Sequence, residues 1–285
     1  MAAEYLVAQE QPLLAFLFAS LPQWSKKSVK QRLQKSAILV NGTYITQHNY
    51  PLKKGDKVTV GNIVTITSTD KEKPSLKILY QDKDIIAIVK PAGLLSVGNQ
   101  KNDEAHALSL LRKQLSKGRK NISLFPVHRL DKATSGVLLF ATSKAMREAV
   151  MAQWSKAQKS YLAIVEGKVK EERGTINQPL RMDDTLYMTH VGEHPQAKKA
   201  ITHYVRTKEG SSTTLLTVTI ETGRQHQIRA HMAWLGHSIV GDERYGKRGK
   251  YLGLHASSLR IKHPRSKKTL CFQTPAPQLF YMLLR

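Results

Sequence analysis

The sequence is poor in cysteine, which disulfides and cysteine-rich metal sites need, and it lacks a long apolar run. Its 285 residues include a single cysteine, Cys271, which excludes an internal disulfide and is typical of a protein of the reducing cytoplasm. No apolar run approaches the roughly 20 residues that a membrane-spanning helix needs. The segment from Met1 to Leu21 has no basic region ahead of its apolar residues, so it does not resemble a signal peptide. We therefore expect a cytoplasmic protein without a membrane segment.

Acidic residues are scarce as well. Asp and Glu total 21 against 45 Lys and Arg, so the formal net charge is +24. Such an excess attracts polyanions at long range, and their binding releases counterions. The hydrophobic fraction of 41% is enough for a buried core. The composition predicts a folded protein that binds nucleic acid, but it does not predict catalysis, because basic ribosomal proteins have a similar composition.

A polar segment divides the chain near residue 73. Residues 68–75 read Ser-Thr-Asp-Lys-Glu-Lys-Pro-Ser, the composition of an exposed linker, and Pro74 disfavours a helix just before it. We therefore predict a small domain over residues 1–72 and a larger domain over residues 73–285.

The small domain has the pattern of two short helices followed by hairpin strands. Apolar residues from Leu13 to Leu21 have helical spacing, and Ser25 can cap a second helix. Val-Asn-Gly at residues 40–42 and Gly-Asp-Lys-Val-Thr-Val at residues 55–60 predict turns beside strands, and they resemble the pattern of the S4 RNA-binding domain. The resemblance implies a small α/β domain whose second helix binds RNA through four cations, Lys26, Lys27, Lys30 and Arg32. The alternative is a generic hairpin beside a solvated basic helix.

The larger domain alternates strands with helices. Apolar or alternating runs predict strands over residues 85–89, 137–141, 161–165 and 216–221. Helical spacing of apolar residues predicts helices over residues 107–115, 143–157 and 224–235. The predicted fold class is therefore α+β, with a mostly antiparallel mixed central sheet and flanking helices.

Asp131 lies directly before one of these strands, between Arg129 and Lys132. The Thr-Ser-Gly sequence at residues 134–136 predicts a turn that fixes the backbone of this acid, as a catalytic group requires. A surface ion pair is the more common role of an acid between two bases, and the spacing alone favours that role.

Residues 221–231 form a second polar segment. In a helix, His226 and Arg229 would share a face. Arg229 could pair with a distant carboxylate and favour its ionised form, or it could contact a phosphate. His226 and His231 are five residues apart, which separates them around a helix, and no nearby acid completes a ligand set. We therefore predict no metal site.

Tyr161 opens an apolar strand, and most tyrosines in that position belong to the core or to a sheet face. A tyrosine can also stack on a flipped base and take part in proton transfer. The position alone favours the core role.

Four segments, in order, resemble the motifs of the RluA family of pseudouridine synthases. Residues 84–97, which contain Lys-Pro-Ala-Gly-Leu, resemble the first motif, and His-Arg-Leu-Asp at residues 128–131 matches the signature. Residues 159–167 match the tyrosine motif, and residues 222–229, with Asp242 beyond them, match the last motif. A further family segment, to which we assign no role, includes Lys199, Thr202 and Tyr204.

The resemblance implies an enzyme that converts uridine in RNA to pseudouridine without a cofactor. Carried over to this sequence, it makes Asp131 the essential carboxylate, Arg229 its ion-pair partner and Tyr161 the aromatic residue against the target base. Arg129 would fill the space that the flipped nucleotide leaves. Further contacts to RNA are expected from His128, Arg224 and His226. An S4-like domain ahead of the catalytic one is common among members that act on ribosomal RNA.

The implied reaction moves the glycosidic bond of one base from N1 to C5. It involves no redox change and loses no group, so it needs neither a nicotinamide nor a metal. The carboxylate can act at the sugar as a nucleophile or as a base, and the sequence leaves both routes open. A stacked base is inaccessible, so the nucleotide must be flipped. Basic clusters at residues 244–250 and 260–268 are expected to hold the RNA backbone.

Two other functions fit parts of the sequence. A non-catalytic RNA-binding ribosome assembly factor would need the charge and the S4-like domain, but it would not need Asp131, Tyr161 and Arg229 together. A metal-dependent nuclease would need clustered acids, whereas residues 183–184 and 242–243 are isolated pairs. We therefore predict a pseudouridine synthase, with large-subunit ribosomal RNA as the first candidate substrate and transfer RNA as the second.

Overall fold

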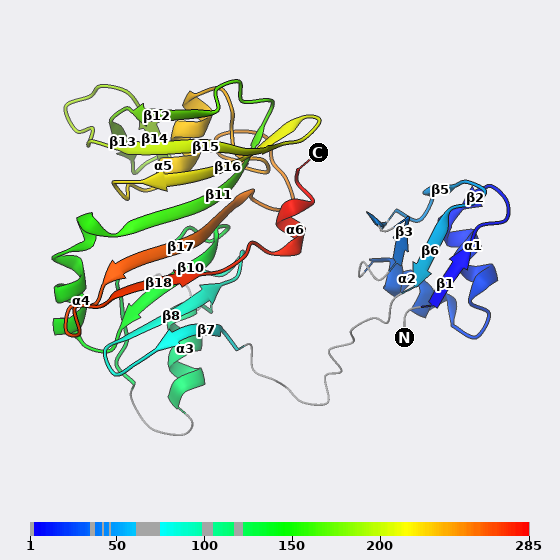
Figure 1. Ribbon diagram of the computed structural model, residues 1–285, viewed down its shortest axis with the longest axis horizontal. Coiled ribbons are helices and arrows are strands. Elements are labelled where there is room, and N and C mark those ends of the chain that lie inside the picture. The colour runs from blue at the N-terminus through cyan, green and yellow to red at the C-terminus, as the bar shows by residue number, and fades with distance from the viewer. Residues whose placement is uncertain are drawn as a thin grey trace. The chain divides into compact units, whose positions relative to one another are not determined.

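The chain forms two compact units, residues 1–73 and residues 74–285 (Figure 1). The computed structural model describes residues 3–34, 38–41, 43–45, 47–60, 75–98, 105–116 and 122–284. Most of the predicted linker therefore lies outside the described residues. The same holds for Gly42, in one of the predicted turns, and for Gly118, near which the helix predicted over residues 107–115 is expected to end.

The first unit combines two short helices with small antiparallel sheets. The helices are α1 (Leu13–Ser20) and α2 (Lys26–Gln34), and the predicted cap of α2 is confirmed, because the Ser25 hydroxyl accepts a hydrogen bond from the Ser28 N–H at 3.2 Å. The strands pair in the order β1-β6-β3-β4, and β2 pairs with β5. Their bounds are Ala3–Leu6 (β1), Gln11–Pro12 (β2), Ile38–Val40 (β3), Thr43–Tyr44 (β4), Pro51–Leu52 (β5) and Lys57–Val60 (β6). The shared core includes Leu13, Leu17, Val29, Ile38 and Val58.

The second unit is built on one ten-stranded sheet. Its main path is β12-β15-β16-β11-β17-β10-β8-β7, with β18 paired to β17 and β9 to β10. Every pairing in this sheet is antiparallel except that of β10 with β17, so the prediction of a mostly antiparallel mixed sheet is confirmed. The strands are β7 (Lys77–Gln81), β8 (Ile85–Lys90), β9 (Phe125–Pro126), β10 (Ser135–Ala141), β11 (Gln158–Glu166), β12 (Arg173–Asn177), β15 (Ile201–Glu209), β16 (Thr213–Ile220), β17 (Leu254–Lys262) and β18 (Thr269–Gln273). A separate hairpin consists of β13 (Leu180–Asp183) and β14 (Met188–Val191).

Helices flank this sheet. They are α3 (Ala107–Ser116), α4 (Lys144–Met151), the 3-10 helix η1 (Trp154–Lys156), α5 (Gln227–Trp234) and α6 (Gln278–Tyr281). Alternate residues of β10 face different helices: Leu138 and Phe140 join the core beside α3, whereas Val137 and Leu139 join the core beside α4. None of the described helices is long and apolar enough to cross a membrane.

The helix that begins after Ser143 is shorter than predicted. The predicted cap is confirmed, because the Ser143 hydroxyl accepts a hydrogen bond from the Met146 N–H at 3.1 Å. The helix ends at Met151 instead of near residue 157, and the chain then tightens into η1. Tertiary packing explains the change, because η1 stacks the ring of Trp154 on that of His128, with centroids 5.2 Å apart.

Helix α5 begins at Gln227 instead of at Arg224. His226, directly before it, has a left-handed backbone with a φ of 53°, which no α-helix contains. The Gln227 side chain fixes this turn, because its Oε1 accepts hydrogen bonds from the Arg224 N–H at 3.0 Å and the Thr222 hydroxyl at 2.8 Å. Its Nε2 donates to the Ile201 carbonyl at 2.9 Å. The turn is therefore held by a buried side chain and was not visible in the apolar spacing.

The two halves of the sheet meet at β10 and β17. Their parallel pairing is limited to Ser135 opposite His255 and Gly136 opposite Ala256. Gly136 has a φ of 121°, and a Cβ at this position would strike the backbone of Ala256, so only glycine permits the close approach. This crossing brings the segment before β10, strand β11 and helix α5 to one place.

Candidate active site

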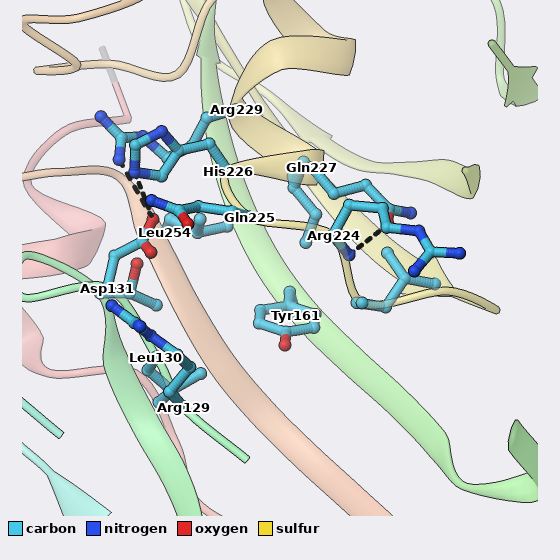
Figure 2. Close-up of a pocket in the computed structure, with 14 residues that line it drawn as sticks. Arg129, Leu130, Asp131, Tyr161, Arg224, Gln225, His226, Gln227, Arg229 and Leu254 are labelled. Carbon is cyan, nitrogen blue, oxygen red and sulfur yellow. Dashed lines mark hydrogen bonds and ion pairs between the residues drawn. The ribbon is translucent and has the colours of Figure 1, made fainter. Parts of the chain in front are cut away.

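A pocket of about 150 Å³ lies where these elements meet (Figure 2). A cavity of this volume accepts a six-membered aromatic ring. Apolar side chains form part of its wall, among them Leu130, Ile220, Ile228 and Leu254. The polar side chains that line it include Arg129, Asp131, Tyr161, Arg224, His226 and Arg229. Among the described residues of the pocket, one carboxylate therefore lies with three arginines.

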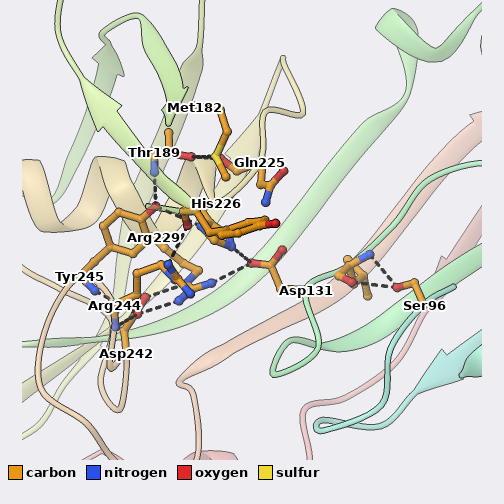
Figure 3. A network of polar contacts seen from close by, with 12 residues as sticks. Ser96, Asp131, Met182, Thr189, Gln225, His226, Arg229, Asp242, Arg244 and Tyr245 are labelled. Carbon is orange, nitrogen blue, oxygen red and sulfur yellow. Dashed lines mark hydrogen bonds and ion pairs between the residues drawn. The ribbon is translucent and has the colours of Figure 1, made fainter. Parts of the chain in front are cut away.

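The segment after β8 fixes the backbone that carries Asp131. The Ser96 hydroxyl donates a hydrogen bond to the Leu130 carbonyl at 2.8 Å and accepts one from the Leu130 N–H at 2.9 Å (Figure 3). The Gly93 N–H donates to the Lys132 carbonyl at 2.8 Å. The residues on both sides of Asp131 are thus tied to the segment that resembles the first family motif.

Lys90 is fully buried beneath the same backbone. Its Nζ donates to the carbonyls of Pro91 at 3.0 Å, Leu94 at 2.7 Å and Lys132 at 3.2 Å. Burial lowers the pKa of Lys90 to about 8, while the charge of Asp131 acts to raise it. These three hydrogen bonds compensate the ammonium group for its burial. Lys90 therefore links the segment after β8 to the segment that carries Asp131.

Arg229 joins two carboxylates. Its Nη1 lies 3.1 Å from Oδ2 of Asp131, while its Nε and Nη2 donate to Asp242 at 2.7 and 2.8 Å. Burial acts to lower the pKa of Arg229, but Asp242 and Asp131 outweigh it, so the pKa is raised. Burial acts to raise the pKa of Asp242, but Arg229 holds it below its usual value. No described residue makes a hydrogen bond or ion pair to Oδ1 of Asp131.

His226 approaches the same carboxylate, with its Nε2 3.7 Å from Oδ2 of Asp131. Its Nδ1 lies 3.0 Å from the hydroxyl of Tyr245, and that hydroxyl accepts a hydrogen bond from the Thr189 N–H at 2.7 Å (Figure 3). A hydroxyl that accepts the Thr189 N–H has its own hydrogen available for Nδ1, and this favours the tautomer with the imidazole proton on Nε2, toward Asp131. Burial lowers the pKa of His226, although Asp131 acts to raise it, so the ring is neutral.

Tyr161 forms the wall of the pocket on β11 (Figure 2). Its ring packs against two hydrophobic cores, one that contains Ile228 of α5 and one that contains Leu111 of α3. Its hydroxyl makes no hydrogen bond with a described residue. Burial, and then the charge of Asp131, raise the pKa of Tyr161 well above its usual value, so the phenol keeps its proton. The ring therefore offers the pocket a neutral aromatic face.

The other residues of the larger domain that were predicted to contact RNA do not all lie at the pocket. Arg129 and Arg224 are exposed at the pocket, and the Nε of Arg224 donates to the Lys199 carbonyl at 3.1 Å. His128 does not line the pocket, because its Nε2 accepts a hydrogen bond from the Leu139 N–H at 3.1 Å and ties the signature segment to β10. Burial and the nearby Lys159 lower the pKa of His128 to about 4, so its ring is neutral.

The segment without an assigned role supports α5. The Thr202 hydroxyl oxygen lies 3.0 Å from Nε2 of Gln227, which donates to it, and 2.8 Å from Nδ1 of His231. Tyr204 is buried in the core that contains Ile228 of the same helix. These contacts hold the helix that carries Arg229 against β15.

The four predicted RNA contacts of the first unit lie on α2. Lys26, Lys27 and Lys30 are exposed. The guanidinium of Arg32 instead lies 3.6 Å from the centroid of the Trp24 ring, and its Nη1 donates to the Ser28 hydroxyl at 2.6 Å. Three of the four cations are therefore turned to solvent.

Sequence reasoning missed residues that the geometry brings to the site. Asp242 was counted in the last family motif and in an isolated acidic pair but was given no role, and no role was given to Lys90, Ser96 or Tyr245. The one available signal was that Lys90, Ser96 and Asp242 fall inside or beside the family motifs. Within the described parts of the chain, no group of three His, Cys, Asp or Glu side chains could hold a metal ion.

Comparison with known proteins gives one consistent result. Residues 84–234 match the model of the RNA pseudouridylate synthase family. The chain is 31% identical to ribosomal large subunit pseudouridine synthase D of Pasteurella multocida over 297 residues, with 95% of this chain and 88% of that protein covered. It is 35% identical to tRNA pseudouridine synthase C of Haemophilus ducreyi over 234 residues, with 73% and 94% covered. The structure of human RNA pseudouridylate synthase domain containing 1 matches with a TM-score of 0.61 at 25% identity, over 71% of this chain and 84% of that one.

The fold and the pocket define an enzyme that acts on a base of RNA, with a carboxylate, an aromatic face and basic walls around one ring-sized cavity. The chain belongs to the RNA pseudouridylate synthase family, whose model spans more than half of its 285 residues. It is therefore an isomerase that forms pseudouridine in RNA, and the two rival functions considered from the sequence are set aside.

Proposed function

We propose that Asp131 is the essential carboxylate of pseudouridine formation, with Arg229 and Tyr161 as its partners. The observation that carries this proposal is the set of contacts made by the Asp131 carboxylate. Asp131 is the only acid among the described residues that line the pocket; Arg229 holds its Oδ2, and its Oδ1 has no hydrogen-bonding partner there. A fixed carboxylate with one unoccupied oxygen suits attack on the sugar and proton removal equally, and both routes use this group.

The remaining pocket residues suit the steps around that chemistry. The target nucleotide is flipped into the pocket, where the ring of Tyr161 stacks against the base and Arg129, at the rim, takes the place of the base in the RNA stack. The apolar wall that includes Ile220 and Leu254 limits the access of water, which would otherwise hydrolyse the cleaved intermediate. The freed uracil stays in the pocket, rotates and is joined again through C5.

Basic surfaces supply the grip on RNA. A groove of about 690 Å³ continues from the pocket at residues 223–225 and is lined by Arg181, Lys198 and Arg224, with Asp184 as its one acid among the described residues. In the first unit we assign residues 1–72 as an S4-like RNA-binding domain, on the basis of its two helices and small sheet and of the exposed lysines of α2. We place the protein in the cytoplasm, where its RNA substrates are modified.

Large-subunit ribosomal RNA is the substrate that we propose. The relative from Pasteurella multocida named for the large ribosomal subunit covers 95% of this chain, whereas the Haemophilus ducreyi relative named for transfer RNA covers 73%. The wider match includes residues of the first unit, which the proposal assigns to RNA binding. Mapping pseudouridines in total RNA from cells with and without the gene identifies the target, and a lost site in transfer RNA alone would contradict this choice.

The assignment of Asp131 is tested by Asp131→Asn, which keeps the shape of the side chain and removes its charge. We expect no pseudouridine formation and nearly unchanged affinity for RNA. The control is Glu193→Gln, which removes one exposed acid outside the pocket and should leave the rate unchanged. A wild-type rate in Asp131→Asn would remove this residue from the mechanism.

A further inference from the structure

A second cationic groove lies between η1 and the β17–β18 hairpin and shares no lining residue with the pocket. Its volume is about 480 Å³. Four cations from two parts of the chain line it, together with two glutamines: Lys156, Arg260, Lys262, Lys267, Gln153 and Gln158. We call it the distal groove.

None of the described residues neutralises the charge of the distal groove. None of the described residues that line it is acidic, and none of its four cations makes an ion pair with a described residue. Arg260 and Lys262 are two residues apart on β17, so their side chains point to the same side of the strand, where both are exposed. Like charges gathered in one concavity repel each other and raise the local concentration of a polyanion.

The turn that carries Lys267 is rigid. The guanidinium of Arg265 donates to both carboxylate oxygens of Asp84, at 2.8 and 2.9 Å, and Asp84 is buried. His263 is also buried, and its Nδ1 accepts the Arg265 N–H at 3.1 Å. Arg265 is therefore committed to Asp84, which removes it from the basic cluster that the sequence suggested for RNA. The ion pair instead ties the turn between β17 and β18 to Asp84, directly before β8.

Lys267 adopts a left-handed backbone with a φ of 60°, a conformation that costs energy for a residue other than glycine. On the other side of the groove, the Gln153 side chain donates to the Lys262 carbonyl at 2.8 Å and joins the turn before η1 to β17. A surface whose backbone is already ordered loses less conformational entropy when it binds a ligand. The cations of the distal groove are therefore attached to a backbone that is already ordered before RNA binds.

The distal groove and the pocket lie on one strand. Leu254 lines the pocket and Arg260 lines the groove, six residues later on β17, which corresponds to about 20 Å at roughly 3.3 Å per residue. Leu254 pairs with Ala163 and Arg260 with Gln158, and these two residues of β11 face opposite sides of the sheet. Leu254 and Arg260 therefore point to different faces, and an RNA that contacts both sites passes around the sheet.

We propose that the distal groove binds the phosphate backbone of the substrate RNA, outside the flipped nucleotide. This inference rests on the proposed function, because it takes RNA as the substrate. Four cations without an ion-pair partner among the described residues, and two amide side chains, match a chain of phosphates, which offers charge and hydrogen-bond acceptors without sequence information. The groove therefore contributes affinity and orientation, while the pocket carries out the reaction.

The test is the triple variant Lys156→Gln, Arg260→Gln and Lys267→Gln in the full chain. The probe is a labelled in vitro transcript of unmodified large-subunit ribosomal RNA in which the wild-type chain forms pseudouridine. We expect Kd at 0.15 M salt to rise about tenfold or more, and the slope of log K against log salt to fall by about 2, since each phosphate contact on a single strand contributes about 0.7. The kcat at saturating RNA should stay that of the wild type.

Two matched variants separate the groove from general charge. Lys77→Gln, Lys170→Gln and Lys208→Gln together remove the same charge from exposed lysines outside both sites, and this triple should change Kd by less than about threefold. Lys156→Arg with Lys267→Arg retains the charge in the groove and should bind like the wild type. Equal losses in the two glutamine triples, or no loss in the groove triple, would overturn the proposal. A wild-type chain that forms no pseudouridine in any ribosomal transcript would instead refute the proposed function.

Discussion

The carboxylate of Asp242 occupies two of the three guanidinium nitrogens of Arg229, and this leaves only Nη1 for Asp131. The two-point contact fixes the plane of the guanidinium, because Arg presents its donors in a rigid fork. The pocket therefore depends on a residue that does not line it. Asp242 also accepts the N–H groups of Arg244 at 3.0 Å and Tyr245 at 3.2 Å, so it orders the turn behind the site.

Asp242→Asn should reduce both stability and activity. The change removes the charge of one of the two carboxylates that pair with the buried Arg229, and breaking a buried ion pair costs about 3 kcal/mol. We expect a lower free energy of unfolding in urea and a large loss of kcat, because Arg229 no longer holds Asp131 in one place. Exposed Asp184→Asn is the control for unfolding and should be neutral. A variant with reduced stability but the kcat of the wild type would mean that Asp242 has no role in the reaction.

Tyr245→Phe should affect the reaction through His226. Without the hydroxyl, Nδ1 of His226 loses its donor, and the proton is no longer fixed on Nε2, toward Asp131. We expect kcat to fall several-fold with little change in KM, and nitrogen-15 NMR of His226 to show a mixture of tautomers. The Thr189 N–H also loses its acceptor, which costs about 1–2 kcal/mol of stability. Reduced stability with kcat and the tautomer unchanged would make Tyr245 a structural residue only.

Much of the fold could be predicted from local patterns, because burial and capping act over short distances. The run at residues 137–141 is buried throughout β10, and Ser25 and Ser143 cap the helices that they were expected to cap. Helix ends were less predictable. The start of α5 depends on a hydrogen bond from the Gln227 side chain to the Ile201 carbonyl, and no local pattern contains a contact across 26 residues.

The site shows the same division between local and long-range information. Spacing alone favoured a surface ion pair for Asp131, and only the resemblance of whole motifs linked it to Arg229, which is 98 residues away in the chain. Asp242 was placed in the last motif, but its contact with Arg229 was not predicted, since an acid beside Glu243 looks like part of an exposed pair. Asp242 is instead buried against Arg229 of α5, which composition does not reveal.

His128 should make the protein sensitive to acid. Its pKa is about 4 in the folded chain because the ring is buried near Lys159, whereas an unfolded histidine has a pKa of about 6.5. As the pH falls below 6.5, the unfolded state takes up a proton that the folded state does not, so the free energy of unfolding decreases. By pH 5 this loss is about 2 kcal/mol. Urea unfolding at pH 7 and pH 5 should show a smaller difference, by that amount, in His128→Gln; an equal difference would contradict the assignment.

Removal of residues 1–72 should weaken RNA binding without changing the reaction. All the described residues that line the pocket belong to the second unit, so kcat at saturating RNA should be retained. The exposed lysines of α2 are lost, so Kd should rise and its dependence on salt should become flatter. Lys26→Gln, Lys27→Gln and Lys30→Gln in the full chain reproduce the loss of charge while the core of the first unit stays intact. If binding is unchanged in both proteins, the first unit does not hold RNA, because neither its shape nor its cations contribute to affinity.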